Sequence, residues 1–399
     1  MSLTDLALER AGVKSLTEFQ KREGLYPSGK EDILTMQRLT PYLLGSRRYM
    51  IRSGDTFYKI ARQLGTTVRA LRAANPGVSP RNLPVGQYLM VPFGFPVVPT
   101  DRPFTSELLA LCIQGLRARY PFIEQKQLGV TAGGRPITLL RIGTGSRKIL
   151  YNASHHANEW ITTPLLMKFL EEYGEAVSRG ASLFGMDAGK LFQSTSLYLV
   201  PMVNPDGVDL VTGAIPKGSI PYSEAREIAA YFPGILFPEG WKANLQGVDL
   251  NLNYPAGWEN AREIKYRQGY DRPAPRDFVG KRPLDQPESA AMAELTRAVR
   301  PRLTISLHTQ GQVIYWKYLD MEPPGGRALG ETFAKISGYF LEDTPYASGF
   351  AGYKDWFILT ENRPGYTVEV GSGSNPLPLE QFDRIYENLF GILATGLRE

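Results

Sequence analysis

The chain has three histidines, and they lie at two places that each end a run of apolar residues. His155 and His156 follow KILYNAS, and His308 follows LTISL. Glu159 stands three residues after His156, a spacing at which one turn of chain can direct an imidazole and a carboxylate at one ion. Zinc accepts both ligand types, and a catalytic site uses three protein ligands and leaves a fourth position to water. We therefore predict that His156, Glu159 and His308 bind zinc, although a His-x-x-Glu pair alone is weak evidence.

These residues need a framework that brings distant segments together. Apolar, β-branched runs alternate with helical patterns through the C-terminal part of the chain, which favours an α/β/α sandwich of three layers around a mixed central sheet. Functional sites in such folds form at the ends of strands. The predicted strands cover residues 148–152, 196–203, 303–307 and 366–370, and predicted helices cover 162–175 and 288–299.

The N-terminal residues show three short helical patterns, LTDLALERAG, SLTEFQKREGL and KEDILTMQRLTPYLLG. Gly12, Gly24 and Gly45 are the expected C-caps of these helices. Through EFQKREGL and LTPYL, residues 1–46 resemble a shortened peptidoglycan-binding domain of three helices. A generic helical extension is the alternative interpretation.

The pattern of helix caps, turns and apolar runs in residues 47–93 predicts a separate small unit, in which two strands flank two helices. Asp55 is the expected N-cap of a helix that ends at Gly65, and Thr67 caps a second helix that Asn75-Pro76 stops. The strand YLMV follows a turn and is expected to pair with the first strand.

The elements SGDT, IA, LGT, NP and the closing VGQYLMVP of this unit resemble the LysM module. The resemblance implies binding of glycans that contain N-acetylglucosamine, chiefly peptidoglycan and chitin. A linker rich in proline, residues 94–102, separates the unit from a catalytic domain expected at 103–399.

Five motifs of the C-terminal part occur in an order that resembles the zinc carboxypeptidase (M14) family: HANE at 156–159, NPDG at 204–207, GVDLN at 247–251, SLHT at 306–309 and TVEVG at 367–371. The resemblance implies the same three zinc ligands, one zinc ion per catalytic domain, and Glu369 as the general base. Glu369 suits this role because an ionised side chain within an apolar strand is costly unless it faces a charge. The resemblance also implies that Asp249 accepts a hydrogen bond from the first zinc-ligating histidine, and that Asn251 contacts substrate.

One departure from the family pattern changes the expected substrate. Carboxypeptidases have an arginine after the asparagine, where it binds the terminal carboxylate of the substrate, and here the residue is Leu252. An alkyl side chain cannot replace that guanidinium, so removal of C-terminal residues is doubtful. The stretches NASHHANEWITTP and GSGSNPLP resemble the γ-D-glutamyl-meso-diaminopimelate peptidase branch, which cuts peptidoglycan stem peptides.

Three further residues are candidates for contacts with the substrate. Lys242 occupies about the place of the family arginine that stabilises the oxyanion, and we expect it to polarise the carbonyl or bind the α-carboxylate of D-glutamate. A solvated surface lysine is the alternative. Tyr346 and Tyr353 are both candidates for the family's mobile tyrosine that covers the substrate, and their spacing does not decide between them.

The expected function is therefore hydrolysis of the γ-D-glutamyl bond to diaminopimelate, or to a related diamino acid, with the N-terminal modules bound to glycan. A metallocarboxypeptidase or an N-acyl amino acid amidohydrolase of the same fold is the first alternative. A catalytically silent peptidoglycan-binding scaffold is the second.

Composition restricts the partners. Residues 1–93 hold 14 lysines and arginines against 7 acidic residues, which suits contact with an anionic polymer or simply solubility. No nucleic-acid motif occurs, and no run reaches the roughly 18 apolar residues of a membrane helix, so neither nucleic-acid binding nor membrane insertion is expected. Because the start lacks a signal-peptide pattern, we expect a cytoplasmic, spore-associated or cell-wall-associated bacterial enzyme, or one whose leader is missing.

Overall fold

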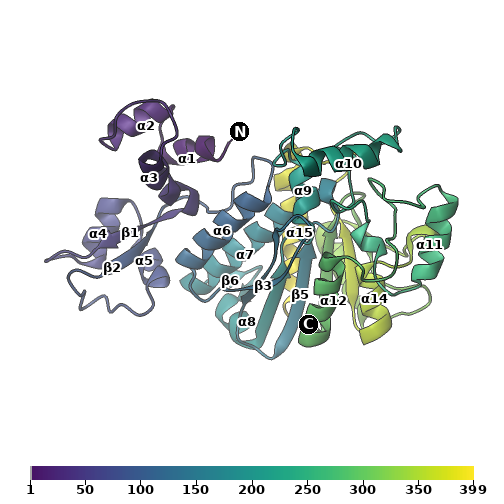
Figure 1. Cartoon of the computed structure of the whole chain (residues 1–399). Helices are drawn as coiled ribbons and strands as arrows, with labels where there is room; N and C mark the ends of the chain where they lie inside the picture. Colours follow the sequence, from purple (N-terminus) through teal and green to yellow (C-terminus); the bar gives the residue numbers. More distant parts are fainter. Residues whose placement is uncertain (1) are drawn as a thin grey trace. The chain divides into compact units, whose positions relative to one another are not determined.

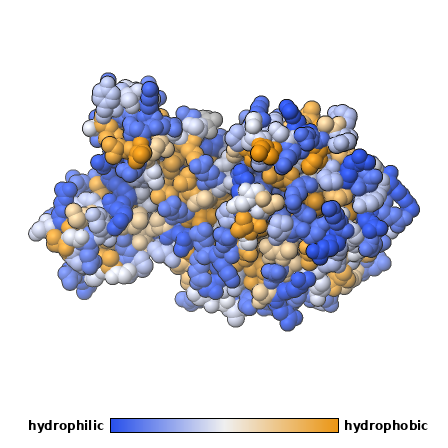
Figure 2. Space-filling model, in the orientation of Figure 1, coloured by the Kyte–Doolittle hydropathy of each residue, from blue (hydrophilic) through white to orange (hydrophobic). Residues whose placement is uncertain are grey.

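The computed structural model describes residues 2–399, which form two compact units. The first unit contains residues 2–102, 107–124 and 171–181, and the second contains 103–106, 125–170 and 182–399. Among the described helices, none is long and apolar enough to span a bilayer. On the face drawn in Figure 2, hydrophobic residues are interspersed with hydrophilic ones.

The first unit begins with three helices, α1 (Leu3–Ala11), α2 (Leu16–Arg22) and α3 (Ile33–Leu44). Gly12 and Gly45 end α1 and α3 in the left-handed conformation, as predicted. The prediction for Gly24 is wrong, because Glu23 is the C-cap of α2.

The expected ββ-flanked helix pair follows, with β1 (Ser46–Met50), α4 (Phe57–Leu64), α5 (Val68–Ala74) and β2 (Tyr88–Pro92). Strands β1 and β2 pair antiparallel, and the helices pack an apolar core that includes Ile60, Leu71 and Leu89. Thr67 caps α5 as predicted, but Asp55 does not cap α4. Thr56 takes that place, because the Asp55 carboxylate accepts hydrogen bonds from the Arg52 backbone and the Tyr49 hydroxyl instead.

A mixed sheet of eight strands, in the order β11-β10-β12-β9-β5-β8-β4-β3, is the frame of the second unit. Its four central strands, β12, β9, β5 and β8, run parallel, while β4 and β10 run antiparallel to their neighbours β8 and β12. The strands are β3 (Glu124–Val130), β4 (Pro136–Ile142), β5 (Arg147–Ala153), β8 (Thr195–Val200), β9 (Leu303–His308), β10 (Val313–Tyr315), β11 (Phe340–Glu342) and β12 (Gly365–Glu369). A separate short hairpin joins β6 (Ser182–Leu183) to β7 (Met186–Asp187).

Helices cover both faces of this sheet. On one face the Tyr151 hydroxyl of β5 donates to a carbonyl of α15 (Phe382–Gly396), and the Tyr366 hydroxyl of β12 donates to the first residue of α13 (Gly326–Ser337). On the other face α14 (Tyr353–Glu361) packs on β9 and β12, and α12 (Pro287–Val299) shares its apolar core with Leu150 of β5 (Figure 1). The predicted three-layer α/β class is confirmed.

The remaining helices complete the element list. They are α6 (Ser106–Arg119), α7 (Thr162–Arg179), α8 (Ala188–Ser194), α9 (Pro205–Val211), α10 (Ile220–Ala230) and α11 (Trp258–Arg267), with 3-10 turns η1 (Ala157–Glu159), η2 (Leu250–Leu252), η3 (Tyr346–Ser348) and η4 (Leu379–Gln381).

Candidate metal centre and active site

The three predicted zinc ligands lie at the carboxyl ends of two neighbouring strands. His308 is the last residue of β9, while His156 and Glu159 lie in the turn after β5, where the 3-10 helix η1 begins. Strands β5 and β9 pair in parallel, with Ala153 opposite Leu307, so both carboxyl ends reach the same edge of the sheet. This pairing brings together residues separated by 149 and 152 positions in the sequence.

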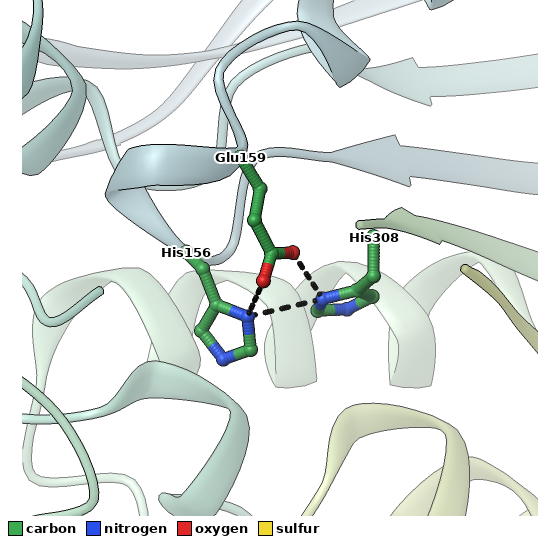
Figure 3. A group of neighbouring side chains, drawn as sticks. All are labelled: His156, Glu159 and His308. Carbon is green, nitrogen blue, oxygen red and sulfur yellow. Dashed lines mark hydrogen bonds and ion pairs between the residues drawn. The ribbon is translucent and has the colours of Figure 1, made fainter. Parts of the chain in front are cut away.

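The donor atoms of these three residues converge. Glu159 places one carboxylate oxygen 2.9 Å from Nδ1 of His156 and the other 2.9 Å from Nδ1 of His308, and the two imidazole nitrogens are 3.2 Å apart (Figure 3). All three residues are buried, and their ligand atoms lie within 4.8 Å of one another. Two imidazole nitrogens and one carboxylate are the donor set of a catalytic zinc site, so these residues fit a zinc ion.

Asp249 lies on the far side of the His156 ring, at the start of η2. Its Oδ1 is 3.1 Å from Nε2 of His156, and its two oxygens also accept backbone hydrogen bonds from Asn251 and Asp277. Burial favours a raised pKa, but the charge and hydrogen bond of His156 hold the pKa of Asp249 below its usual range. A carboxylate at Nε2 favours the tautomer whose proton is on Nε2, which leaves the Nδ1 lone pair directed toward Glu159.

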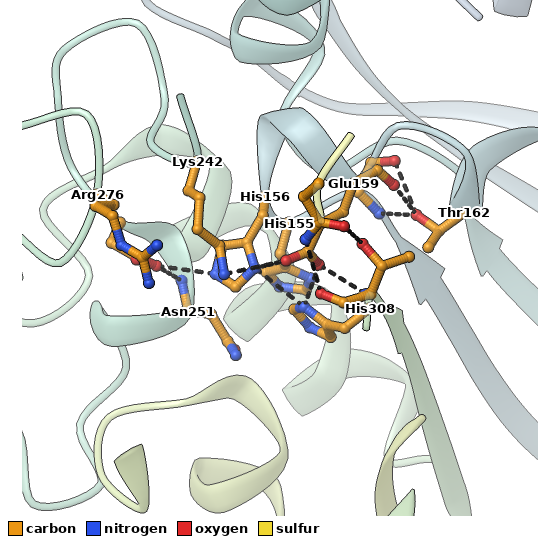
Figure 4. Close-up of polar contacts among 12 residues, drawn as sticks. His155, His156, Glu159, Thr162, Lys242, Asn251, Arg276 and His308 are labelled. Carbon is orange, nitrogen blue, oxygen red and sulfur yellow. Dashed lines mark hydrogen bonds and ion pairs between the residues drawn. The ribbon is translucent and has the colours of Figure 1, made fainter. Parts of the chain in front are cut away.

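Glu159 is surrounded by positive charge and hydrogen-bond donors. The backbone amide of Thr309 donates to Oε2 at 3.1 Å, and Nζ of Lys242 lies 3.1 Å from Oε1 (Figure 4). Burial alone would raise the pKa of Glu159, but the charges of His156 and Lys242 hold it well below its usual range. Glu159 is therefore ionised, which is the form that binds a metal.

Glu369 is the last residue of β12, directly beside the candidate metal ligands. In the parallel pairing of β12 with β9, Glu369 is opposite His308, so both side chains lie on the same face of the sheet. The side chain is half-buried, and its carboxylate makes no hydrogen bond or ion pair with any residue in the described range 2–399. Burial and the negative charge of Glu159 raise the pKa of Glu369 to about 8. A divalent cation beside it would favour the ionised form.

Lys242 is held beside the site by its backbone. Its amide donates to the carbonyl of Pro275 at 2.7 Å, and its side chain is mostly buried with Nζ at Glu159. Burial lowers the pKa of Lys242, but the charges of Glu159 and Asp249 outweigh this effect and raise it. The structure therefore places a fixed positive charge beside the metal ligands and does not place Lys242 free in solvent.

The structure separates the two tyrosine candidates. Tyr353 begins α14 and lies fully in the core, where its hydroxyl pairs with the Thr296 hydroxyl at 2.8 Å. Because this side chain is buried and bonded in the core, its position does not favour Tyr353 as the tyrosine that covers the substrate. Tyr346 lies in η3 with 70% of its surface exposed, and it remains the candidate.

The other sequence candidates have clear positions. Asn251 is half-buried, and its Oδ1 accepts a hydrogen bond from the backbone of Tyr353, so its side chain connects η2 to α14. Leu252 packs in the apolar core below the site. His155, which is not a predicted ligand, is buried with Nε2 3.1 Å from the Tyr254 hydroxyl.

Two contributors to the site were not found by sequence reasoning. The Thr309 amide that contacts Glu159 is a backbone group, and such groups leave no signal in the residue types. Arg276 lies near Lys242 and Asn251 in Figure 4, but it belongs to an irregular segment between α11 and α12 that carries no recognised motif.

Comparison with known proteins places this geometry in a family. The model of the zinc carboxypeptidase family matches residues 110–391, and the LysM domain model matches residues 49–92. A γ-D-glutamyl-L-diamino acid endopeptidase 1 of Lysinibacillus sphaericus is 45% identical over 287 residues, covering 71% of this chain and 70% of the relative. The uncharacterized protein YqgT of Bacillus subtilis is 43% identical over 280 residues, covering 70% of this chain and 73% of that protein.

Solved structures agree on the fold. Bovine thrombin-activatable fibrinolysis inhibitor matches with a TM-score of 0.55 at 18% identity, covering 75% of this chain and 97% of that one. Carboxypeptidase A of Helicoverpa armigera matches with a TM-score of 0.54 at 19% identity, covering 85% and 80%. The family prediction and the LysM prediction are both confirmed: the chain belongs to the zinc carboxypeptidase family and carries a LysM domain before its catalytic region.

Proposed function

We propose that this protein is a zinc metallopeptidase that hydrolyses the γ-D-glutamyl bond to a diamino acid in peptidoglycan stem peptides. The observation that carries the proposal is the convergence of His156, Glu159 and His308 at the ends of two parallel strands. The relative from Lysinibacillus sphaericus, whose name states this bond specificity, supports the choice of substrate.

The position of Leu252 argues against a carboxypeptidase. A carboxypeptidase requires a cation that binds the terminal carboxylate of its substrate, and the motif position expected to supply it holds a leucine buried in the core. An endopeptidase has no such requirement, because the chain continues beyond the scissile bond.

The proposed roles follow from where each group lies. His156, Glu159 and His308 would hold one zinc ion, which lowers the pKa of a water molecule toward about 7. Asp249 fixes the His156 ring in the tautomer that leaves Nδ1 free for the metal. Its contribution is to position the ligand, because it bonds to Nε2 of His156, while Glu159 lies at Nδ1.

Glu369 would accept the proton of the attacking water and pass it to the leaving amine. Its carboxylate is not committed to any partner in residues 2–399, and its position opposite His308 brings it to the edge where the metal ligands meet. Lys242 would stabilise the negative charge that develops on the carbonyl oxygen, since its ammonium is fixed beside Glu159. Tyr346 would cover the bound substrate.

The N-terminal modules would bring this chemistry to the cell wall. Residues 1–46 and the LysM unit at 47–93 would bind glycan, and 103–399 would form the peptidase. Residues 94–102 would connect them as a fixed segment, because Val97 and Val98 are buried and their backbone amides donate to the carboxylate of Glu171. The two family matches, at 49–92 and 110–391, support this division. Binding to the polymer raises the local concentration of stem peptides without a new contact in the active site.

The test is the product pattern from the tetrapeptide L-Ala-γ-D-Glu-meso-diaminopimelate-D-Ala. Mass spectrometry should detect L-Ala-D-Glu and diaminopimelate-D-Ala, and a zinc chelator should abolish both. The same peptide with an ordinary α-linked D-glutamate is the control and should stay intact. Release of free D-Ala alone would show a carboxypeptidase and contradict the proposal, and no cleavage of any peptide by zinc-loaded enzyme would favour a silent scaffold.

A further inference from the structure

The segment 275–277 is fixed to both sides of the candidate active site. The carbonyl of Pro275 accepts hydrogen bonds from the backbone amides of Lys242, at 2.7 Å, and Ala243, at 2.9 Å. The backbone amide of Asp277 donates to Oδ2 of Asp249 at 3.2 Å. Arg276 lies between these two anchors, so its position is set by the same residues that border the metal centre.

Asp277 also fixes the direction of the Arg276 side chain. Its carboxylate accepts a hydrogen bond from Nε of Arg276 at 2.6 Å and another from Nζ of Lys265 at 2.5 Å. Asp277 is buried with a backbone φ of 66°, a conformation that costs energy for a residue with a side chain and that is frequent at functional sites. The guanidinium is thus held by a rigid support.

The rest of the guanidinium remains available. Its two terminal nitrogens make no hydrogen bond with any residue between 2 and 399, and 44% of the side chain is exposed. In Figure 4 the guanidinium lies on the side of Lys242 and Asn251, across the site from Thr162. An arginine fixed through Nε presents its terminal nitrogens as a planar fork, which matches both oxygens of a carboxylate.

The proposed substrate needs such a partner, and the other groups do not provide one. A γ-linked D-glutamate keeps its α-carboxylate free, and diaminopimelate carries a further carboxylate on its side chain. Leu252 has no charge, and the ammonium of Lys242, fixed beside Glu159, is already assigned to the carbonyl oxygen of the scissile bond. An unpaired substrate carboxylate in a partly buried site would lose affinity through desolvation.

We propose that Arg276 binds a free carboxylate of the substrate beside the scissile bond and thereby determines specificity for acidic γ-linked peptides. This inference rests on the proposed function and adds a specificity residue to it.

The test compares three tetrapeptides: the parent, one with D-isoglutamine in place of D-glutamate, and one with the side-chain carboxylate of diaminopimelate amidated. Arg276→Gln should lower kcat/KM on the parent by about 10- to 100-fold, the loss expected for a charge-assisted pair. It should change kcat/KM by less than about threefold on the peptide that lacks the contacted carboxylate. Arg276→Lys should recover part of the preference for the parent.

The three peptides show which substrate carboxylate Arg276 contacts. If Arg276→Gln has no effect on kcat/KM for the isoglutamine peptide, Arg276 binds the α-carboxylate of D-glutamate. If it has no effect for the peptide with amidated diaminopimelate, Arg276 binds the side-chain carboxylate of diaminopimelate. The inference would be overturned if Arg276→Gln lowered kcat/KM equally on all three peptides or on none of them. The proposed function would still stand in that case, provided that the wild type cleaves the parent peptide. Arg272→Gln, an exposed arginine four residues earlier that pairs with Asp271, is the matched control and should leave all three values unchanged.

A binding measurement distinguishes this inference from the proposed function. In zinc-loaded Glu369→Gln enzyme, whose turnover should be slowed by about 100-fold or more, the Kd of the parent should rise by the same factor when Arg276→Gln is added. Failure of the wild type to cleave any peptide would contradict the proposed function alone, and equal Kd values with and without Arg276 would contradict the carboxylate contact alone. Zinc content and Tm of each variant should match those of the wild type, which excludes a loss caused by misfolding.

Discussion

The LysM unit and the metal centre are built in opposite ways. The LysM unit spans fewer than fifty residues and is held by an apolar cluster that includes Phe57, Ile60 and Leu71, with a polar side chain capping each helix. The metal centre joins residues separated by 152 positions and buries charged groups against one another. One region derives its structure from local signals, whereas the other exists only once the whole sheet has formed. Changes in the two regions should therefore affect different measurements.

The largest effect is expected at Glu369. Glu369→Gln keeps the size of the side chain but removes the proton acceptor, and general acid-base groups contribute about 10²- to 10⁴-fold. We expect kcat on the tetrapeptide to fall by this factor, with zinc content and glycan binding unchanged. Retention of more than a tenth of the wild-type kcat would show that another group accepts the proton.

The next effect concerns the support of the metal ligand. Asp249→Asn removes the charge that holds the His156 tautomer, and such changes cost about 10- to 100-fold in metal affinity or activity. A competition titration with a zinc chelator measures the affinity directly. An unchanged zinc affinity would mean that Asp249 does not position His156.

The third change is in the apolar core of the LysM unit, and it should affect glycan binding without affecting catalysis. Leu71→Ala removes a fully buried side chain, which costs about 2–5 kcal/mol, a large part of the stability of so small a unit. Binding to insoluble peptidoglycan should fall, while kcat/KM on the soluble tetrapeptide should stay within about twofold. Leu236→Ala, at a leucine that is 77% exposed and lies outside both proposed glycan-binding modules, is the matched control and should affect neither. An equal loss on the soluble peptide would show that the two regions are not independent.

The smallest effect is a pH dependence in the core of the peptidase. Glu288 of α12 is fully buried, and Oε2 accepts a 3.4 Å hydrogen bond from Asn244. Burial, with a contribution from the charge of Asp206, raises its pKa to about 7, from 4.5. The folded state therefore holds this proton more tightly than the unfolded state, and stability falls as pH rises from 4.5 to 7.

Glu288→Gln should remove this dependence, because glutamine has no proton to lose. The quantity to compare is the unfolding free energy of the variant minus that of the wild type. Between pH 4.5 and a pH above 7, this difference should change in favour of the variant by about 2–3 kcal/mol. Urea unfolding at the two pH values measures this difference. Parallel stability curves would mean that Glu288 keeps its usual pKa in the fold.

The sequence predicted the elements that rest on strong local signals. The strand that ends at His308 and the helix α12 agree with prediction to within one residue at each end. The strand predicted to reach residue 203 ends at Val200. Beyond it the chain leaves the sheet, although the backbone amide of Val203 still donates to the carbonyl of Ala153 at the end of β5. Four strands of the large sheet were not predicted. The edge strands β3 and β11 are mostly exposed and show no apolar run, β10 has only three residues, and β4 was missed although its run PITLLRI is apolar.

Some residues of the site could be identified from sequence motifs, and others only from the structure. Motif order was enough to nominate His156, Glu159 and His308, and the structure brings their donor atoms together. The choice between Tyr346 and Tyr353 needed the structure, because burial in the core depends on packing that neighbouring residues do not reveal. Arg276 reaches the site only through backbone bonds to two distant segments, so no spacing rule could have identified it.

Zinc analysis of the purified protein tests the central claim most directly. Elemental mass spectrometry should find one zinc per chain in the wild type and in His155→Gln, and less than a tenth of that amount in His308→Ala. His155 is the matched control because it is a buried histidine next to His156 whose ring bonds to Tyr254 and, among the described residues, makes no hydrogen bond with the three predicted ligands. Equal zinc in both variants, or none in the wild type, would contradict the claim that His156, Glu159 and His308 form a metal centre.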